Sequence, residues 1–109
     1  MDQEENWIKI AGDINEISFP ANNIAEIQFG NKSICLAKTS KGLRACSTKC
    51  PHARGDLSEG FLDKKGNIIC PVHDYRFSLS TGRDTEGEGY FLKIYKLKET
   101  PQGIFIKLE

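Results

Sequence analysis

The chain has 109 residues, which is enough for one compact domain and too few for two cores of ordinary size. Fifteen lysine and arginine residues balance fifteen aspartate and glutamate residues, and this zero formal charge argues against a nucleic-acid binder held by phosphate neutralisation. No apolar run approaches the roughly 20 residues of a membrane span, and the start Met-Asp-Gln-Glu-Glu lacks the pattern of a signal peptide. We therefore expect a cytoplasmic protein without membrane association.

The first half of the chain is typical of β-structure. Strand-like runs, of which the first alternates, predict strands at Trp7–Ile10, Ile24–Phe29, Ser33–Ala37 and Leu43–Ser47. Gly30-Asn31-Lys32 joins the second and third of these strands as a hairpin, and Lys41-Gly42 forms the next turn.

The turn expected at Lys41-Gly42 predicts how Cys35 and Cys46 lie relative to each other. A two-residue turn at Lys41-Gly42 pairs Cys46 with Ala37 and leaves Cys35 as a diagonal neighbour at roughly 7–8 Å, beyond normal disulfide reach. We therefore expect Cys35 and Cys46 to be small buried hydrophobic residues with no disulfide between them.

The amino-acid composition changes between Lys49 and about Gly89. Gly, Pro, Asp and Ser recur there, and apolar residues occur only in short runs. This stretch is predicted to be mostly loops. Strand-like alternation returns at Tyr90–Leu97 and Ile104–Leu108. No apolar stripe persists at helical spacing, so the prediction is a single all-β domain. The expected base is an antiparallel β-sandwich or partly closed barrel. A loop-rich insertion of about forty residues interrupts this base, and an insertion of that length needs an additional stabilising interaction to fix its structure.

Aromatic residues on the predicted strands have a structural interpretation. Trp7, Phe91, Tyr95 and Phe105 follow the strand alternation and are expected to be packing residues. Phe77 is expected to lie in the core beneath the insertion.

The insertion contains a pattern of metal-ligating residues. Cys50-Pro51-His52 and Cys70-Pro71-Val72-His73 contain the only two histidines of the chain. Two loops that each offer a thiolate and an imidazole suit zinc or an iron–sulfur cluster. Zinc fingers and ribbons commonly pair like ligands on one loop, whereas each loop here is mixed.

Cys-x-His followed by Cys-x-x-His resembles the Rieske proteins, which bind a [2Fe–2S] cluster with two cysteines on one iron and two histidines on the other. The flanking residues Asp56–Gly60, Tyr75-Arg76-Phe77 and Thr81-Gly82 are similar to those of small bacterial Rieske ferredoxins. The resemblance covers roughly residues 43 to 97. It implies that Cys50, His52, Cys70 and His73 hold the cluster, in a cluster-binding subdomain at residues 46–85 of a single Rieske domain spanning residues 1–109.

The resemblance also bears on the reduction potential. High-potential respiratory members carry two additional cysteines, joined as a disulfide, and a serine that bonds the cluster. Here the matching positions hold Gly55, Val72 and Tyr75. Fewer hydroxyl hydrogen bonds to sulfur imply a low value within the range of about −150 to +300 mV. Tyr75 itself has two open roles: a hydrogen bond to the cluster or its cysteine, or no role beyond structure.

Two positions depart from the family pattern. Asp74 follows the second ligand histidine, where many ferredoxin-type members have glycine, and Thr85–Gly89 replaces a loop that usually shields the cluster with proline. Residues 50 to 90 include five basic and seven acidic residues, which gives this segment a net charge of minus two. This mildly acidic end favours a partner with a basic docking patch, although a solvated loop without partner significance is the alternative.

The chain lacks a phosphate loop, a dinucleotide fingerprint and a nucleophile with a base, so we expect an electron-transfer protein rather than an enzyme. The resemblance implies a soluble ferredoxin, a monomer or weak oligomer, that takes electrons from an NAD(P)H-dependent reductase and passes them to a terminal oxygenase. The alternatives are the Rieske-like small subunit of an NAD(P)H-dependent nitrite reductase and a structural zinc-binding module.

Overall fold

The computed structural model describes residues 7–52 and 54–108, and the all-β prediction is confirmed for them. Two short 3-10 helices, η2 (Ile14–Glu16) and η3 (Leu57–Glu59), accompany the strands. No helix in this part of the chain is long and apolar enough to cross a membrane. The strands are β1 (Trp7–Ala11), β2 (Ile24–Phe29), β3 (Lys32–Thr39), β4 (Gly42–Ser47), β5 (Phe61–Leu62), β6 (Asn67–Ile69), β7 (Arg76–Ser78), β8 (Ile94–Thr100) and β9 (Gly103–Lys107).

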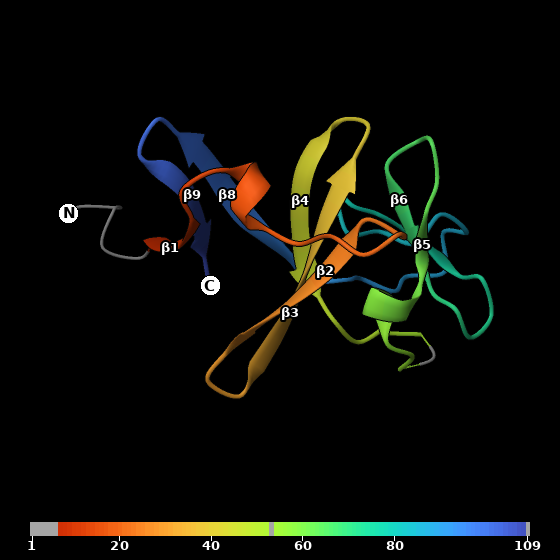
Figure 1. Ribbon diagram of the computed structural model, residues 1–109. Coiled ribbons are helices and arrows are strands. Elements are labelled where there is room, and N and C mark those ends of the chain that lie inside the picture. The colour runs from red at the N-terminus through yellow and green to blue at the C-terminus, as the bar shows by residue number, and fades with distance from the viewer. Residues whose placement is uncertain (1–6, 53, 109) are drawn as a thin grey trace.

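The base of the molecule is one curled antiparallel sheet made from both ends of the chain. Its strand order over the described residues is β1-β9-β8-β4-β3-β2 (Figure 1). The predicted base is therefore a partly open barrel, in which β8 and β9 pair with each other and β8 joins β4. The remaining segment, between β4 and β8, lies on one side of this sheet.

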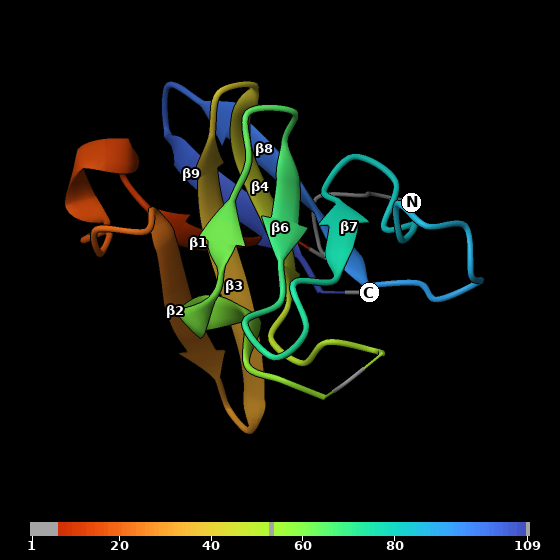
Figure 2. The ribbon, with the colours of Figure 1, turned by 90° about the vertical axis from the view of Figure 1, so that its right-hand side faces the viewer.

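The predicted loop-rich insertion contains a second small sheet. Strands β5, β6 and β7 form an antiparallel sheet in that order, and Figure 2 shows it in front of the base. Its strands are two or three residues long, too short for any periodicity to be visible in the sequence.

The predicted strand at Tyr90–Leu97 is wrong in its first half, because β8 begins only at Ile94. The preceding residues bond to the insertion: the Leu92 N–H donates to the Gly82 carbonyl at 2.7 Å, and Phe91 forms a bridge with Arg83. Phe91 is consequently 58% exposed and stacks against the Arg83 guanidinium, so its predicted role as a packing residue is also wrong. Tyr95, by contrast, is buried as predicted.

The register between β3 and β4 also differs from the prediction. The hairpin closes with Thr39 opposite Gly42, which has a φ of +114°, so the turn comprises residues 40 and 41. Cys46 therefore lies directly opposite Cys35 instead of Ala37. Both thiols are free and fully buried, which agrees with the prediction of no disulfide. A hydrogen bond with Cys35, together with burial, raises the pKa of the Cys46 thiol well above its ordinary value.

The strand β3 is buried on both faces and separates two parts of the core. Ile34 and Leu36 face a cluster with Tyr95 and Ile106 on one side of the base sheet. Their neighbours Cys35 and Ala37 face the other side, as the two-residue period of a strand requires. That second cluster is shared with the insertion and includes Cys50, Leu57, Ile68, Cys70, Phe77, Leu79 and Leu92. The base sheet and the insertion therefore share one core, and the predicted ligand cysteines lie in it.

Asn22 provides a polar link between the base and the insertion. Its side-chain amide donates to the carbonyl oxygens of Ser58 at 2.9 Å and Gly60 at 3.0 Å, and its oxygen accepts from the Ile24 N–H. One side chain just before β2 thus bonds two carbonyl groups around η3, which leads from the first predicted ligand loop into the small sheet.

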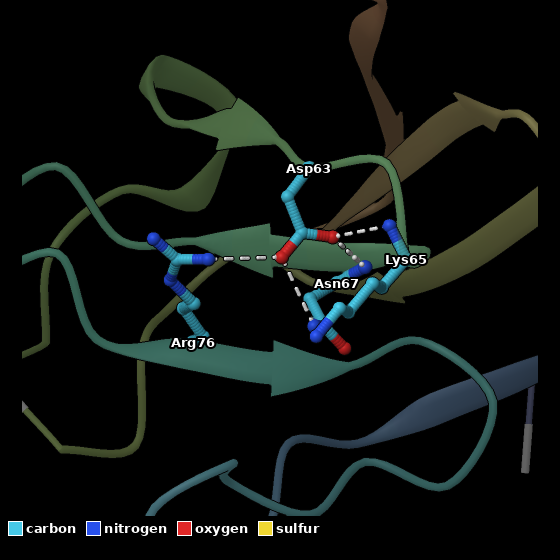
Figure 3. Close-up of polar contacts among 4 residues, drawn as sticks. All are labelled: Asp63, Lys65, Asn67 and Arg76. Carbon is cyan, nitrogen blue, oxygen red and sulfur yellow. Dashed lines mark hydrogen bonds and ion pairs between the residues drawn. The ribbon is translucent and has the colours of Figure 1, made fainter.

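The turn between β5 and β6 is organised by Asp63 (Figure 3). Its carboxylate accepts hydrogen bonds from the backbone N–H groups of Lys65 and Asn67 and from the Asn67 side chain, and it forms an ion pair with Arg76 of β7 at 3.1 Å. Burial opposes ionisation, but the hydrogen bonds from Asn67 and Lys65 and the Arg76 charge outweigh it, so the pKa of Asp63 is lowered.

The lowered pKa predicts a pH-dependent contribution to stability. A carboxyl group with a depressed pKa in the folded state stabilises the protein above its unfolded pKa of about 3.9, and this contribution is lost as the pH falls through the folded value. At pH 7 we expect Asp63→Asn to lower the free energy of unfolding by about 1–2 kcal/mol, because a charged acceptor is lost. Urea unfolding at pH 7, 4 and 3 measures the difference, which should shrink at the lowest pH. A difference that stays constant over this range contradicts the prediction.

Candidate metal centre

The two predicted ligand loops adopt the same backbone turn. In the first loop the Cys50 N–H donates to the Gly55 carbonyl at 2.9 Å, and the Arg54 N–H donates back to the Cys50 carbonyl at 2.7 Å. In the second loop the Cys70 N–H donates to the Tyr75 carbonyl at 2.8 Å, and Asp74 returns a bond to Cys70 at 2.9 Å. Each cysteine thus begins a closed turn that contains the following histidine.

The two cysteine side chains meet at the inner end of these turns. Both are fully buried, and their thiols share a hydrogen bond. Burial raises the pKa of Cys70 and the contact with Cys50 adds to the rise, whereas the backbone N–H groups of Val72 and His73 bond the sulfur and oppose it. These N–H groups would stabilise negative charge on the sulfur once a metal has displaced the proton.

Gly55 allows the two loops to approach each other. A Cβ atom at Gly55 would lie 2.9 Å from the Sγ of Cys70 and 2.5 Å from a methyl group of Val72. Any side chain at this position would therefore displace the second loop from the first.

His52 has a buried ring nitrogen without a hydrogen-bond partner. This atom is Nδ1, and the arrangement costs free energy unless something else binds the nitrogen. The His52 and His73 rings lie 6.1 Å apart at an interplanar angle of 75°. His73 is exposed and His52 half-buried. Among the described residues, no three His, Cys, Asp or Glu side chains converge closely enough to share one ion.

Aromatic rings surround His52. The Tyr75 ring is stacked on the imidazole with centroids 4.1 Å apart and planes 5° apart. The Tyr90 ring meets the imidazole edge-on at 5.1 Å. The Tyr75 hydroxyl donates to the Glu88 carboxylate at 2.7 Å. The sequence left Tyr75 either a hydrogen bond to the cluster or its cysteine, or no role beyond structure. Its ring instead contacts the predicted ligand His52, and its hydroxyl donates to Glu88.

The chain matches the Rieske [2Fe–2S] domain over residues 6–89. It belongs to this family. The ferredoxin component of the naphthalene 1,2-dioxygenase/salicylate 5-hydroxylase systems of a Ralstonia species is 30% identical over 79 residues, which cover 72% of each chain. The match includes both ligand loops, so the sequence resemblance is confirmed.

Two solved structures share the fold of this chain at lower identity. The ferredoxin of carbazole 1,9a-dioxygenase from Nocardioides aromaticivorans superimposes with a TM-score of 0.78 at 18% identity, covering 95% of this chain and 99% of the other. A putative NADH-dependent nitrite reductase small subunit from Mycobacterium tuberculosis gives 0.77 at 14% identity, covering 94% and 95%. The same fold thus occurs in a ferredoxin and in a putative nitrite reductase small subunit.

The residues of this Rieske domain fit the cluster that the family implies. The thiols of Cys50 and Cys70 are adjacent, the Nδ1 of His52 is buried without a partner, and the missing side chain at Gly55 leaves room beside a sulfur. Two thiolates and two imidazoles from paired loops are the donor set of a Rieske centre.

Three residues near His52 were missed by the sequence analysis, which treated Thr85–Gly89 only as an acidic replacement of a proline loop. Asp84 is 6% exposed and accepts hydrogen bonds from the N–H groups of Glu88 and Tyr90, both at 2.8 Å. The bond to the Glu88 N–H is the largest effect that lowers the pKa of Asp84. The available signal was Asp84 followed within five residues by Gly87 and Gly89, a combination typical of a turn held by the Asp side chain.

The backbone conformation at the position after the second predicted ligand histidine favours glycine. Asp74 has a φ of +57° and Arg54, at the equivalent place in the first loop, a φ of +59°. We expect Asp74→Gly to retain or slightly raise stability, whereas Asp74→Val should cost about 1–2 kcal/mol because β-branched residues are strained in this conformation. Thermal unfolding of the two variants measures the difference, and Arg54→Val is expected to behave like Asp74→Val. Equal melting temperatures for the glycine and valine variants would contradict this account.

Proposed function

We propose that this chain is a one-electron carrier of the Rieske ferredoxin class. It would accept electrons from an NAD(P)H-dependent flavin reductase and deliver them to a terminal oxygenase. The observation that carries the proposal is the buried Nδ1 of His52 without a partner, in a loop whose cysteine bonds the cysteine of the matching loop. The relatives named as ferredoxin components of oxygenase systems support the same conclusion.

In this proposal the sulfur atoms of Cys50 and Cys70 bind one iron, and the Nδ1 atoms of His52 and His73 bind the other. The bound [2Fe–2S] cluster supplies reversible uptake of a single electron. Residues 46–85 would be the cluster-binding subdomain of a single Rieske domain spanning residues 1–109. A cytoplasmic location suits this role, since the thiol pool of that compartment is reduced and leaves cysteines available as metal ligands.

The surface around the histidines suits a protein partner. Val72 is 49% exposed beside His73, and Tyr90 is 37% exposed beside His52. Asp74, Glu86 and Glu88 on the same loops are also exposed. A small apolar patch bordered by carboxylates favours a partner with basic residues at the rim of its docking site, and the charges act mainly on the association rate.

The test is reconstitution with defined partners. The anaerobically purified protein should be red-brown and contain two irons and two acid-labile sulfides per chain. It should be reduced by NADH through the flavin reductase of a bacterial oxygenase system and reoxidised by the terminal oxygenase of that system. A colourless protein with one zinc would end the proposal in favour of a structural zinc module.

The nitrite reductase small subunit remains a second candidate, because its solved relative matches the fold as well as the ferredoxin does. The two functions differ in assembly. A free carrier elutes alone on size-exclusion chromatography, whereas a dedicated subunit co-purifies with a large sirohaem protein from its own cells.

A further inference from the structure

The orientation of the His52 ring depends on contacts outside its own loop. The torsion that turns an imidazole about its Cβ–Cγ bond has broad, weakly defined minima, so a ligating ring needs neighbours to hold its plane. In metal sites this is usually done by a hydrogen bond to the second ring nitrogen. At His52 the stacked neighbour is Tyr75. Its ring is parallel to the imidazole to within 5° at a centroid distance of 4.1 Å.

Tyr75 is itself held at two points. Its carbonyl closes the second ligand turn by accepting the Cys70 N–H at 2.8 Å, and its hydroxyl donates to Glu88 at 2.7 Å. Glu88 is positioned in turn by the buried carboxylate of Asp84, which accepts the Glu88 N–H. The same carboxylate accepts the N–H of Tyr90, whose ring is edge-on to His52. Both aromatic neighbours of His52 therefore depend on one turn, residues 84–90.

We propose that Tyr75 is a positioning residue for His52, and that the Tyr75–Glu88 hydrogen bond holds the imidazole plane so that Nδ1 is directed at the iron. The inference rests on the proposed function, since it takes His52 as an iron ligand. It joins three segments distant in sequence: the first ligand loop contributes the imidazole, the second contributes the stacked ring, and the turn at 84–90 contributes the acceptor.

Tyr75→Phe and Glu88→Ala both remove the hydrogen bond, while Tyr75→Phe retains the ring. Each variant should release its iron to a ferrous chelator roughly tenfold faster than the unmodified protein, as losses of outer contacts to metal ligands commonly do. The double variant should be no faster than either single one, because the two residues act through one bond. Loss of visible absorption measures the rate.

A spectroscopic measurement separates positioning from a general structural role. The chain has two histidines, so nitrogen hyperfine couplings of the reduced cluster report two imidazoles. In Tyr75→Phe and Glu88→Ala the coupling of one imidazole should shift, and that of the other should stay. His73, which Tyr75 does not stack on, provides the internal reference.

Two further variants separate positioning from charge. Glu88→Gln removes the charge but keeps an oxygen that accepts the Tyr75 hydroxyl, so its couplings should remain close to those of the unmodified protein. Glu86→Ala is the matched control, because Glu86 carries the same charge in the same turn and the single Tyr75 hydroxyl proton is already donated to Glu88. The inference is overturned if Glu88→Gln behaves like Glu88→Ala, or if Tyr75→Phe is indistinguishable from Glu86→Ala in both chelation rate and couplings.

A refutation of the role of Tyr75 can be distinguished from a failure of the proposed function. If the unmodified protein binds no iron, both ideas fall together. If it binds two irons and the variants match the Glu86→Ala control, only the role of Tyr75 is refuted.

Discussion

Replacing Cys50 or Cys70 with alanine should abolish iron binding, and the paired controls are the other two cysteines of the chain. All four are fully buried and lie in one core cluster, so they are matched in environment. Cys50 and Cys70 begin the two closed turns, whereas Cys35 and Cys46 face each other on β3 and β4. We expect Cys35→Ala and Cys46→Ala to retain two irons and to lose about 1–2 kcal/mol of stability from the deleted sulfur.

The same variants test whether the cluster supports the insertion. A metal site that joins two loops contributes its binding free energy to folding. Without the cluster, the exposed basic residues of the insertion should become sites of rapid trypsin cleavage, with a rate roughly tenfold or more above that of the loaded protein. Iron analysis and timed proteolysis of the four variants measure both effects. Retention of iron by Cys50→Ala, or its loss from Cys35→Ala, would refute the ligand assignment.

Phe77→Ala should be the most destabilising single change in the small sheet. Phe77 is fully buried in the core shared by the base and the insertion, and its ring lies 5.5 Å from that of Tyr75. Deleting a buried phenyl ring costs about 3–5 kcal/mol, from lost burial and from the cavity left behind. The loss would also remove support beneath the second ligand turn, so cluster loss should accelerate. Urea unfolding followed by circular dichroism, with visible absorption recorded in parallel, measures the two effects.

Phe61→Ala is the control for Phe77→Ala, because Phe61 belongs to the same small sheet but is 55% exposed. We expect it to change stability by less than about 1 kcal/mol. Similar losses in the two variants would mean that the small sheet does not depend on the shared core.

The candidate ligands could be predicted from the sequence because their chemistry is local. Each ligand loop is a short turn that begins at a cysteine, and the mixed pairs Cys50/His52 and Cys70/His73 require no knowledge of distant contacts. The long strands of the base were predictable for a related reason, since β2, β3 and β9 are runs of five or more residues that are rich in apolar side chains and bounded by turn residues.

The register error at the second hairpin shows where this local information ends. The turn was expected at Lys41-Gly42, but Thr39 pairs with Gly42, and the Thr39 hydroxyl bonds both the Gly42 carbonyl and the Lys41 N–H. Side-chain hydrogen bonds within the turn decide the register, and alternation alone does not reveal them. The consequence is the direct pairing of Cys35 with Cys46.

By itself, the sequence determined the all-β class, the base made from both ends of the chain, and the four candidate ligands, because each of these follows from short-range periodicity or spacing. Only the tertiary structure decided the small sheet, the late start of β8 and the aromatic contacts on His52. These features depend on pairings between segments that are individually two to four residues long. Such segments carry little intrinsic preference, and their conformation is selected by burial and hydrogen bonding against distant parts of the chain.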